Sequence, residues 1–260
     1  MSHKESIKKI INKKNKSKIV CLTSYSKNIA QIIDDHADIV LVGDSLGTVL
    51  YNYNTTRKVD LKMIIEHSKS VRKGVKKSLM IVDMPFNTYK NKLQALKNCK
   101  KIIKETKCDG IKLEGGSKIK DIIKHLVNNK IPVMGHIGIT PQSQRGRFRY
   151  KGKTEKEKKN LLKDSKILEE AGVFAIVLEC IEKKLSKKIT ETIEIPTIGI
   201  GSSKFCDGQI LVLDDLLGLT NSKMKFVKKY ADLKSNIRNA VKKFKLDVKK
   251  GSYPSVKYSY

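Results

Sequence analysis

The chain has 260 residues, of which 39% are hydrophobic, and its 55 lysines and arginines against 26 aspartates and glutamates give a formal charge of +29. No apolar run is long enough to span a bilayer, so we predict neither a transmembrane helix nor a membrane partner. The first residues, MSHKESIKKIINKKNKSK, carry too many lysines for the apolar centre of a signal peptide, which predicts a cytoplasmic protein.

The strong positive charge is typical of nucleic-acid-binding proteins. However, only six of the 55 basic residues are arginine, the residue best suited to phosphate and base recognition. The lysines are spread over every predicted helix, so we interpret them as a solvated surface and predict no nucleic-acid partner. The cysteines form no CxxC pair, which indicates reduced thiols and not a zinc site or a disulfide framework.

In chain order, residues 1–17 are predicted to form a short helix or tail. Eight short runs rich in β-branched residues follow, each typical of a buried strand: 19–23, 39–42, 79–82, 110–113, 132–135, 175–178, 197–200 and 209–213. Between most of them lie longer segments with apolar residues at helical spacing: 61–74, 91–106, 118–129 and 154–172. The last of these opens with Thr154 and Glu157 at the spacing of a capping box.

The end of the chain has its own predicted elements. Residues 223–251 are predicted to form an appended or eighth helix, and we place the C-terminal tail at 246–260. Eight strands alternating with helices predict a parallel sheet, and eight is the number that closes a (β/α)8 TIM barrel. We predict a single α/β domain over residues 1–260. A doubly wound open sheet is the alternative, but its GxGxxG fingerprint is missing, since the chain has GGS after Glu114.

Ionisable residues lie at or near the carboxyl ends of five successive predicted strands: Asp44, Asp83, Lys112 with Glu114, His136 and Glu179. The seventh strand ends instead in glycines, which let a ligand approach the backbone. In a closed barrel these ends converge on one mouth, where packing does not require charges. The pattern therefore predicts an active site.

The candidate metal ligands are Asp44, Asp83 and Glu114, which offer hard oxygen atoms and no cluster of thiolates or histidines. This donor set favours Mg2+ over zinc. Such an ion can hold a 2-oxo acid through its carbonyl and carboxylate oxygens and act as a Lewis acid.

The remaining polar residues fit the chemistry of an enolate. Glu179 could remove the proton next to the carbonyl. Lys112 and His136 could neutralise the substrate carboxylate or donate to developing charge, and Ser45 can hydrogen-bond a carboxylate oxygen. The residues alone thus predict metal-assisted enolisation of a 2-oxo acid, followed by formation or cleavage of a carbon–carbon bond.

Most of these residues also have a structural interpretation. The aspartate and serine after the second strand could cap a helix, and Asp83 could be a turn residue. Lys112 and Glu114 share a strand face and could form an ion pair. His136 could be a hydrogen-bonded core histidine. Glu179 has the weakest alternative, because a buried carboxylate without a role is costly.

Seven motifs occur in an order that closely resembles the ketopantoate hydroxymethyltransferase family: LVGDSLGTVLYNYNTT, VDMPF, IKLEGG, IPVMGHIGITPQS, FAIVLECI, IPTIGIG and CDGQILVLDDLLGL. The resemblance implies a (β/α)8 barrel, Mg2+, and transfer of a hydroxymethyl group from 5,10-methylenetetrahydrofolate to 3-methyl-2-oxobutanoate, giving 2-dehydropantoate. It also implies a cytoplasmic homo-oligomer, typically a decamer.

The resemblance also implies roles for individual residues. The metal would be held by Asp44 and Asp83 with support from Glu114. The keto acid would contact Ser45 and Lys112, with His136 near it, and Glu179 would be the base. Three departures from the family's usual sequence occur: Ser26 replaces an aspartate; the loop after TPQS, usually glycine-rich and longer, reads QRGRFRYKGKT; and GIGSS replaces GIGAG while Asp214 replaces a histidine.

Two other functions remain as alternatives. A lyase or mutase of the phosphoenolpyruvate/isocitrate-lyase type shares Mg2+-enolate chemistry, but it usually has a loop cysteine in a KKCG-like setting, and no cysteine here has that setting. A non-catalytic nucleic-acid-binding protein would need a contiguous positive face. We also hypothesise that the loop with Arg145, Arg147, Phe148, Arg149 and Tyr150 borders the folate entrance and attracts its glutamate tail; the alternative is a solvated loop.

Overall fold

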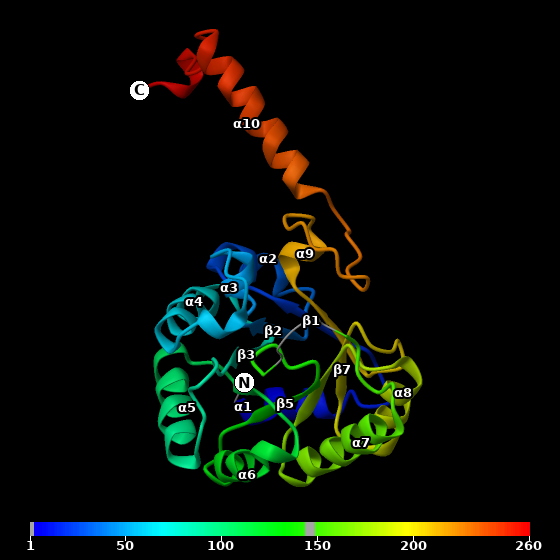
Figure 1. Cartoon of the computed structure of the whole chain (residues 1–260). Coiled ribbons are helices and arrows are strands. Elements are labelled where there is room, and N and C mark those ends of the chain that lie inside the picture. The colour runs from blue at the N-terminus through cyan, green and yellow to red at the C-terminus, as the bar shows by residue number, and fades with distance from the viewer. Residues whose placement is uncertain (1–2, 144–148) are drawn as a thin grey trace. The chain divides into compact units, whose positions relative to one another are not determined.

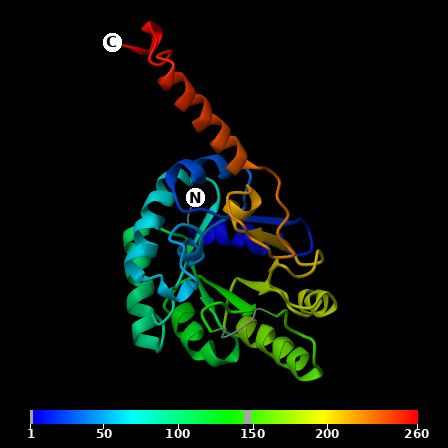
Figure 2. The same ribbon diagram turned by 45° about the horizontal axis from the view of Figure 1, so that its top comes forward.

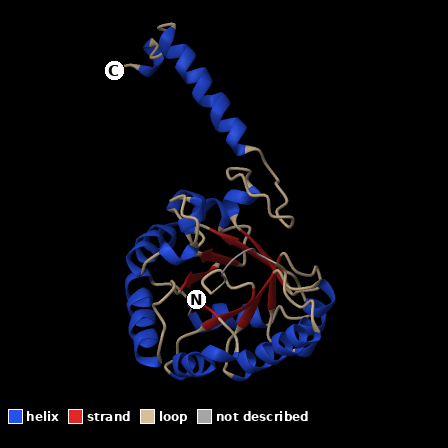
Figure 3. Ribbon diagram, in the orientation of Figure 1, coloured by secondary structure: helices blue, strands red, loops and turns tan. Residues whose placement is uncertain are grey.

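The computed structural model describes residues 3–143 and 149–260, and its centre is a barrel of parallel strands paired in chain order. The strands are β1 (Ile19–Thr23), β2 (Ile39–Val42), β3 (Leu79–Asp83), β4 (Gly110–Glu114), β5 (Val133–Gly138), β6 (Ala175–Glu179), β7 (Thr197–Ile200) and β8 (Gly208–Leu211). The barrel closes where β1 pairs with β8, Cys21 lying opposite Ile210. Figure 3 shows these strands inside a ring of helices. The predicted (β/α)8 fold is confirmed.

The helices between the strands form the outer ring (Figure 1). They are α2 (Lys27–Ile33), α3 (Leu46–Val49), α4 (Leu61–Gly74), α5 (Lys92–Thr106), α6 (Lys120–Asn128), α7 (Glu155–Glu170) and α8 (Lys183–Thr192). Short 3-10 turns occur at Thr56–Lys58 and Ser117–Ile119. The predicted boundaries hold to within one to three residues, and the largest extension places His136 inside β5, which runs on to Gly138.

Helix boundaries follow the capping residues that the sequence supplies. The carboxylate of Asp60 accepts a hydrogen bond from Met63 N at 2.8 Å and starts α4. Thr154 Oγ1 accepts from Glu157 N at 3.2 Å and starts α7, which confirms the predicted cap. The end of α4 needs Gly74, because a Cβ there would lie 2.4 Å from the carbonyl oxygen of Lys27. The glycine therefore permits the close packing of α4 on α2.

The helix α1 (His3–Ile11) packs against the amino end of the barrel, and it is the dark blue helix near the centre of Figure 2. Ile7 and Ile10 are buried in the same hydrophobic cluster as the inward-facing residues of the strands. The segment that follows is anchored by Lys14, whose ammonium lies 2.9 Å from Asp207 Oδ2. These contacts hold α1 and the following segment against the amino end of the barrel.

Asp34 is a buried carboxylate that organises the connection between α4 and β3. It accepts hydrogen bonds from the backbone N–H groups of Lys76 at 2.7 Å, Lys77 at 2.9 Å and Ser78 at 2.9 Å. Burial alone would raise the pKa of Asp34, but these hydrogen bonds outweigh it and hold the pKa below its ordinary value.

We expect Asp34→Ala to lower the free energy of unfolding by about 2–4 kcal/mol at pH 7, because three backbone N–H groups, that of Ser78 buried and the others partly buried, lose a charged acceptor. A carboxyl with a lowered pKa stabilises the fold above its unfolded pKa of about 4, and this contribution is lost as the pH falls through the lower folded value. Urea denaturation should therefore show the deficit at pH 7 and a smaller one at pH 3. Asp35→Ala, which removes only an exposed ion pair with Lys77, is the control. Equal effects of the two variants would contradict the assignment.

The chain divides into two compact units, Met1–Val212 and Leu213–Tyr260. The second contains α9 (Leu213–Leu216), α10 (Leu233–Lys249) and a 3-10 turn at Val256–Tyr258. The prediction of a helix over 223–251 was wrong for its first ten residues, since α10 starts only after Asp232, which caps it by accepting from Ser235 N at 3.2 Å. Within the described ranges, no helix combines the length and apolar character needed to cross a membrane.

Candidate active site

The predicted ionisable residues lie at the carboxyl ends of neighbouring strands. The strand register places Asp83 beside Lys112, and Glu114 beside His136. It also places Gly138, at the end of β5, beside Glu179. Asp44, Asp83, Lys112, Glu114 and His136 are buried. The side chain of Glu179 is 19% exposed, so a ligand in the mouth of the barrel can reach it.

Their side chains form one continuous chain of contacts. Lys112 Nζ lies 2.9 Å from Asp83 Oδ1 and 3.4 Å from His136 Nδ1. His136 Nδ1 also lies 3.6 Å from Glu114 Oε1. On its other side, His136 Nε2 lies 3.2 Å from Glu179 Oε2. The imidazole therefore links the candidate base to the lysine and to the carboxylate of β4.

The electrostatics of the cluster are dominated by closely spaced carboxylates. Asp44 N donates to Asp83 Oδ2 at 3.0 Å, which brings the ends of β2 and β3 together. Burial, and then the negative charges of Asp83 and Glu114, raise the pKa of Asp44 to about 8. Burial also raises the pKa of Asp83, although Lys112 opposes this. The positive charge of Lys112 therefore only partly offsets the burial and mutual repulsion of the Asp44 and Asp83 carboxylates.

Two further pKa shifts follow from the same cluster. Burial disfavours the charged form of Lys112, but Asp83 and Glu114 outweigh it, so its pKa is raised and the side chain stays an ammonium. Burial would also raise the pKa of Glu114, but the hydrogen bond and charge of His136 and the charge of Lys112 hold it below its ordinary value. Lys112 and Glu114 are therefore both charged at neutral pH.

The donor set fits Mg2+ better than a metal that needs a complete cage of protein ligands. Among the described residues, no three His, Cys, Asp or Glu side chains form a ready-made metal-binding group. Mg2+ is usually bound by one or two carboxylates together with waters and substrate oxygens. Asp44 and Asp83 supply two such carboxylates, and Asp83 Oδ1 is buried and accepts no well-formed hydrogen bond from the described part of the chain. Glu114 Oε2 instead accepts from Gln142 N at 3.0 Å.

Three residues that contact the predicted site residues or one another were not singled out from the sequence: Tyr25, Tyr89 and Gln142. Ser45 occupies the N-cap position of α3, but its side chain makes no capping bond. Its hydroxyl instead lies 2.8 Å from the hydroxyl of Tyr25. Gln142 contacts Asp44, and Tyr89 contacts Gln142. Gln142 belongs to the TPQS motif, which carried the family resemblance, but nothing in the sequence assigned a role to this residue.

The backbone around Glu179 is tightly constrained. Gly138 has a φ of 104°, and a Cβ there would lie 2.2 Å from the carbonyl oxygen of Glu179. Cys180 adopts a left-handed φ of 49°, which is uncommon for a residue with a side chain. Ser202, from the GIGSS segment, donates to Leu178 O at 2.7 Å and accepts from Ile181 N at 3.1 Å. The strands on both sides thus fix the direction in which Glu179 leaves β6.

The structure also bears on the alternative interpretations. Asp83 is the last residue of β3, and its carboxylate pairs with Lys112 of the neighbouring strand. His136 lies among charged groups, which is unusual for a core histidine. In the proposed folate loop, Arg145, Arg147 and Phe148 lie outside the described residues. The Tyr150 ring is described, with Lys153 Nζ 4.4 Å from its centroid, and the folate hypothesis stays a prediction.

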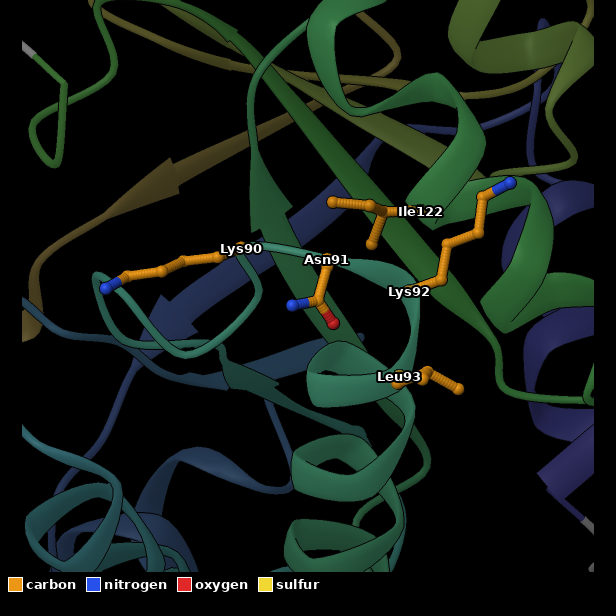
Figure 4. Close-up of a pocket in the computed structure, with 5 residues that line it drawn as sticks. All are labelled: Lys90, Asn91, Lys92, Leu93 and Ile122. Atoms are coloured by element: carbon orange, nitrogen blue, oxygen red, sulfur yellow. The ribbon is translucent and has the colours of Figure 1, made fainter.

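A separate surface pocket lies on the outside of the barrel, where the start of α5 faces α6 (Figure 4). It has a volume of about 390 Å³ and is lined by Lys90, Asn91, Lys92, Leu93 and Ile122. None of these side chains is a carboxylate or an imidazole, so the pocket lacks the groups for the acid–base chemistry expected at the barrel mouth.

Comparison with known sequences gives a match over almost the whole chain. Residues 4–256 match the model of the family described as ketopantoate hydroxymethyltransferase. A protein of Pelagibacter ubique named 3-methyl-2-oxobutanoate hydroxymethyltransferase is 61% identical over 256 residues, which cover 97% of this chain and 99% of that protein. A Helicobacter pylori protein of the same name is 47% identical, with 95% of this chain and 93% of that protein covered.

Comparison with solved structures gives the same barrel at low sequence identity. A phosphonopyruvate hydrolase in complex with oxalate and Mg2+ superimposes with a TM-score of 0.64 at 9% identity, covering 99% of this chain and 93% of that chain. A 2,3-dimethylmalate lyase, described as a member of the PEP mutase/isocitrate lyase superfamily, gives 0.63 at 12% identity, covering 95% and 87%. At this identity the likeness concerns the fold alone.

Proposed function

This chain belongs to the ketopantoate hydroxymethyltransferase family. We therefore propose that it transfers a hydroxymethyl group from 5,10-methylenetetrahydrofolate to 3-methyl-2-oxobutanoate, with Mg2+ as cofactor. The product would be 2-dehydropantoate, made in the cytoplasm. The observation that carries the proposal is the convergence of two carboxylates, Asp44 and Asp83, with Lys112 and Glu179 at one end of the barrel. A metal-bound keto acid needs this combination of anionic ligands, a cation and a base.

Binding of the keto acid would use the buried side of the cluster. Asp44 and Asp83 would hold Mg2+, with support from Glu114. When bound, Mg2+ would withdraw electrons from the keto oxygen as a Lewis acid. Lys112 would balance the substrate carboxylate, and the Ser45 hydroxyl, oriented by its contact with Tyr25, would hydrogen-bond it.

Proton transfer would use the exposed side. Glu179 would remove the proton from C3 of 3-methyl-2-oxobutanoate, the carbon next to the carbonyl. His136, with Nε2 at 3.2 Å, would hold Oε2 of Glu179, so that the other oxygen is free to face the substrate. The C–H bond is then replaced by a C–C bond to the one-carbon unit, the hydroxyl oxygen comes from water, and tetrahydrofolate leaves.

We also propose that the chain forms a homo-oligomer, a decamer, as the resemblance implies, without a nucleic-acid or membrane partner. Light scattering of the purified protein would measure its mass, and a monomeric mass would contradict this part of the proposal.

The reaction itself can be tested by NMR. Protein incubated with 3-methyl-2-oxobutanoate, methylenetetrahydrofolate and Mg2+ should form 2-dehydropantoate, and EDTA should stop it. Omitting the folate should leave exchange of the C3 proton with solvent deuterium but no product. Cleavage or rearrangement of a 2-oxo acid without folate would favour the lyase or mutase alternative instead.

A further inference from the structure

Gln142 is a buried amide at the centre of the carboxylate cluster. It comes from the loop after β5 and is 2% exposed. Its Nε2 donates to Asp44 Oδ2 at 2.8 Å and to the carbonyl oxygen of Met84 at 2.9 Å. Its Oε1 accepts from the hydroxyl of Tyr89 at 2.5 Å, and its backbone N–H donates to Glu114 Oε2. One residue therefore contacts the carboxylate that follows β2 and the carboxylate at the end of β4, and it uses both of its side-chain N–H groups.

The orientation of this amide is determined by its partners. The carbonyl oxygen of Met84 can only accept, so the nitrogen of the amide must face it, and the oxygen must then face Tyr89. Since that oxygen can only accept, the Tyr89 hydroxyl is the donor of the hydrogen bond between them. Tyr89 thus fixes Gln142, and Gln142 fixes one oxygen of Asp44.

We propose that Gln142 is a positioning residue that presents Asp44 to the divalent cation, and that Tyr89 acts through it. The inference rests on the proposed function, because it assumes that Asp44 is a ligand. With Oδ2 engaged by the amide, Oδ1 of Asp44 is left to face a cation. A neutral donor is suited to this task, since it orients the carboxylate without adding the positive charge that would compete with Mg2+.

The test is Mg2+ binding by isothermal titration calorimetry on the purified full chain. Gln142→Met keeps the side-chain length and removes both donors, and we expect it to weaken Mg2+ binding by roughly 10- to 100-fold, the usual range for groups that orient metal ligands. Tyr89→Phe should weaken it by a smaller factor. Gln209→Met is the control, because Gln209 Nε2 also donates to a carbonyl oxygen, that of Ser203 at 2.9 Å, but the residue lies exposed on β8 and this hydrogen bond involves neither Asp44 nor Glu114.

The outcomes separate positioning from folding. If Gln142 only stabilised the fold, Gln142→Met would lower the melting temperature in EDTA and leave the Mg2+ affinity of the folded protein unchanged. If Gln142 positions the ligand, turnover should recover toward the wild-type value at saturating Mg2+. Should Gln142→Met fail to fold, Tyr89→Phe gives the readout. Affinity within threefold of wild type in the folded variant overturns the inference alone, whereas a wild-type protein that does not bind Mg2+ overturns the metal in the proposed function as well.

Discussion

Glu179→Gln should lower kcat by roughly 100- to 10,000-fold, the contribution typical of a positioned general base. Glutamine has nearly the size of glutamate and can still contact His136 Nε2, but it cannot accept the substrate proton. The constraints on the backbone of β6 are unchanged by this substitution, so the barrel should keep its stability. Steady-state kinetics at saturating keto acid and folate would measure the loss.

Proton exchange identifies the step that is lost. In deuterium oxide without folate, the wild type should exchange the C3 proton of the keto acid, and Glu179→Gln should not. Glu191→Gln is the control, because Glu191 lies on the outer surface of α8, 3.5 Å from Lys187, with its side chain 62% exposed. An exchange rate in Glu179→Gln within about threefold of wild type would mean that another group is the base.

Asp83→Asn should weaken Mg2+ binding and lower turnover by roughly 1,000-fold or more, because a Lewis acid is worth several kcal/mol of transition-state stabilisation. The carboxylate of Asp83 has one oxygen facing Lys112 and the other accepting from Asp44 N. An amide has no charge and a single oxygen, so the ion pair with Lys112 is lost, and the hydrogen bond from Asp44 N is kept only if the remaining oxygen faces that group. Calorimetric titration with Mg2+ and kinetics on the same preparation would measure both effects.

The chain contains a matched control for this substitution. Asp38, which precedes β2 at the opposite end of the barrel, has partners of the same two kinds, a lysine ammonium and a backbone N–H. Lys13 Nζ lies 2.6 Å from its Oδ1, and Val20 N donates to its Oδ2 at 2.9 Å. We expect urea denaturation to show lower stability for both Asp38→Asn and Asp83→Asn, whereas Asp38→Asn should leave Mg2+ affinity and kcat unchanged. If Asp83→Asn bound Mg2+ as tightly as the wild type, Asp83 would not be a ligand.

The positions of the strands and of the charged residues could be predicted because both depend on local sequence. A run of β-branched residues followed by Asp44 or Asp83 defines a strand and its carboxyl end. Barrel geometry then requires those ends to meet. Contacts made through neighbouring strands, such as Asp83 with Lys112, follow from the same register.

The supporting contacts could not be predicted, because they depend on the paths of the loops. Gln142 and Asp44 are 98 residues apart, and no periodicity links them. The start of α10 was missed for a related reason. Residues 223–232 have apolar side chains at helical spacing, but Tyr230 N donates to Leu216 O and Leu233 N to Leu217 O. These bonds to the end of α9 replace the helical ones.

The packing of α1 against the amino end of the barrel has a consequence for how the chain folds as it leaves the ribosome. Ile7 and Ile10 are synthesised long before Ile210 of the last strand, yet they share a hydrophobic cluster with it. Lys14 likewise cannot form its ion pair until Asp207, which is 193 residues further along the chain, has been synthesised. Contacts between residues this far apart in sequence require the closure of a long loop, which is entropically costly. We therefore expect α1 to pack against the barrel only after nearly all of the barrel has been synthesised. Until then its isoleucines remain exposed, and a chaperone bound there would protect the nascent protein.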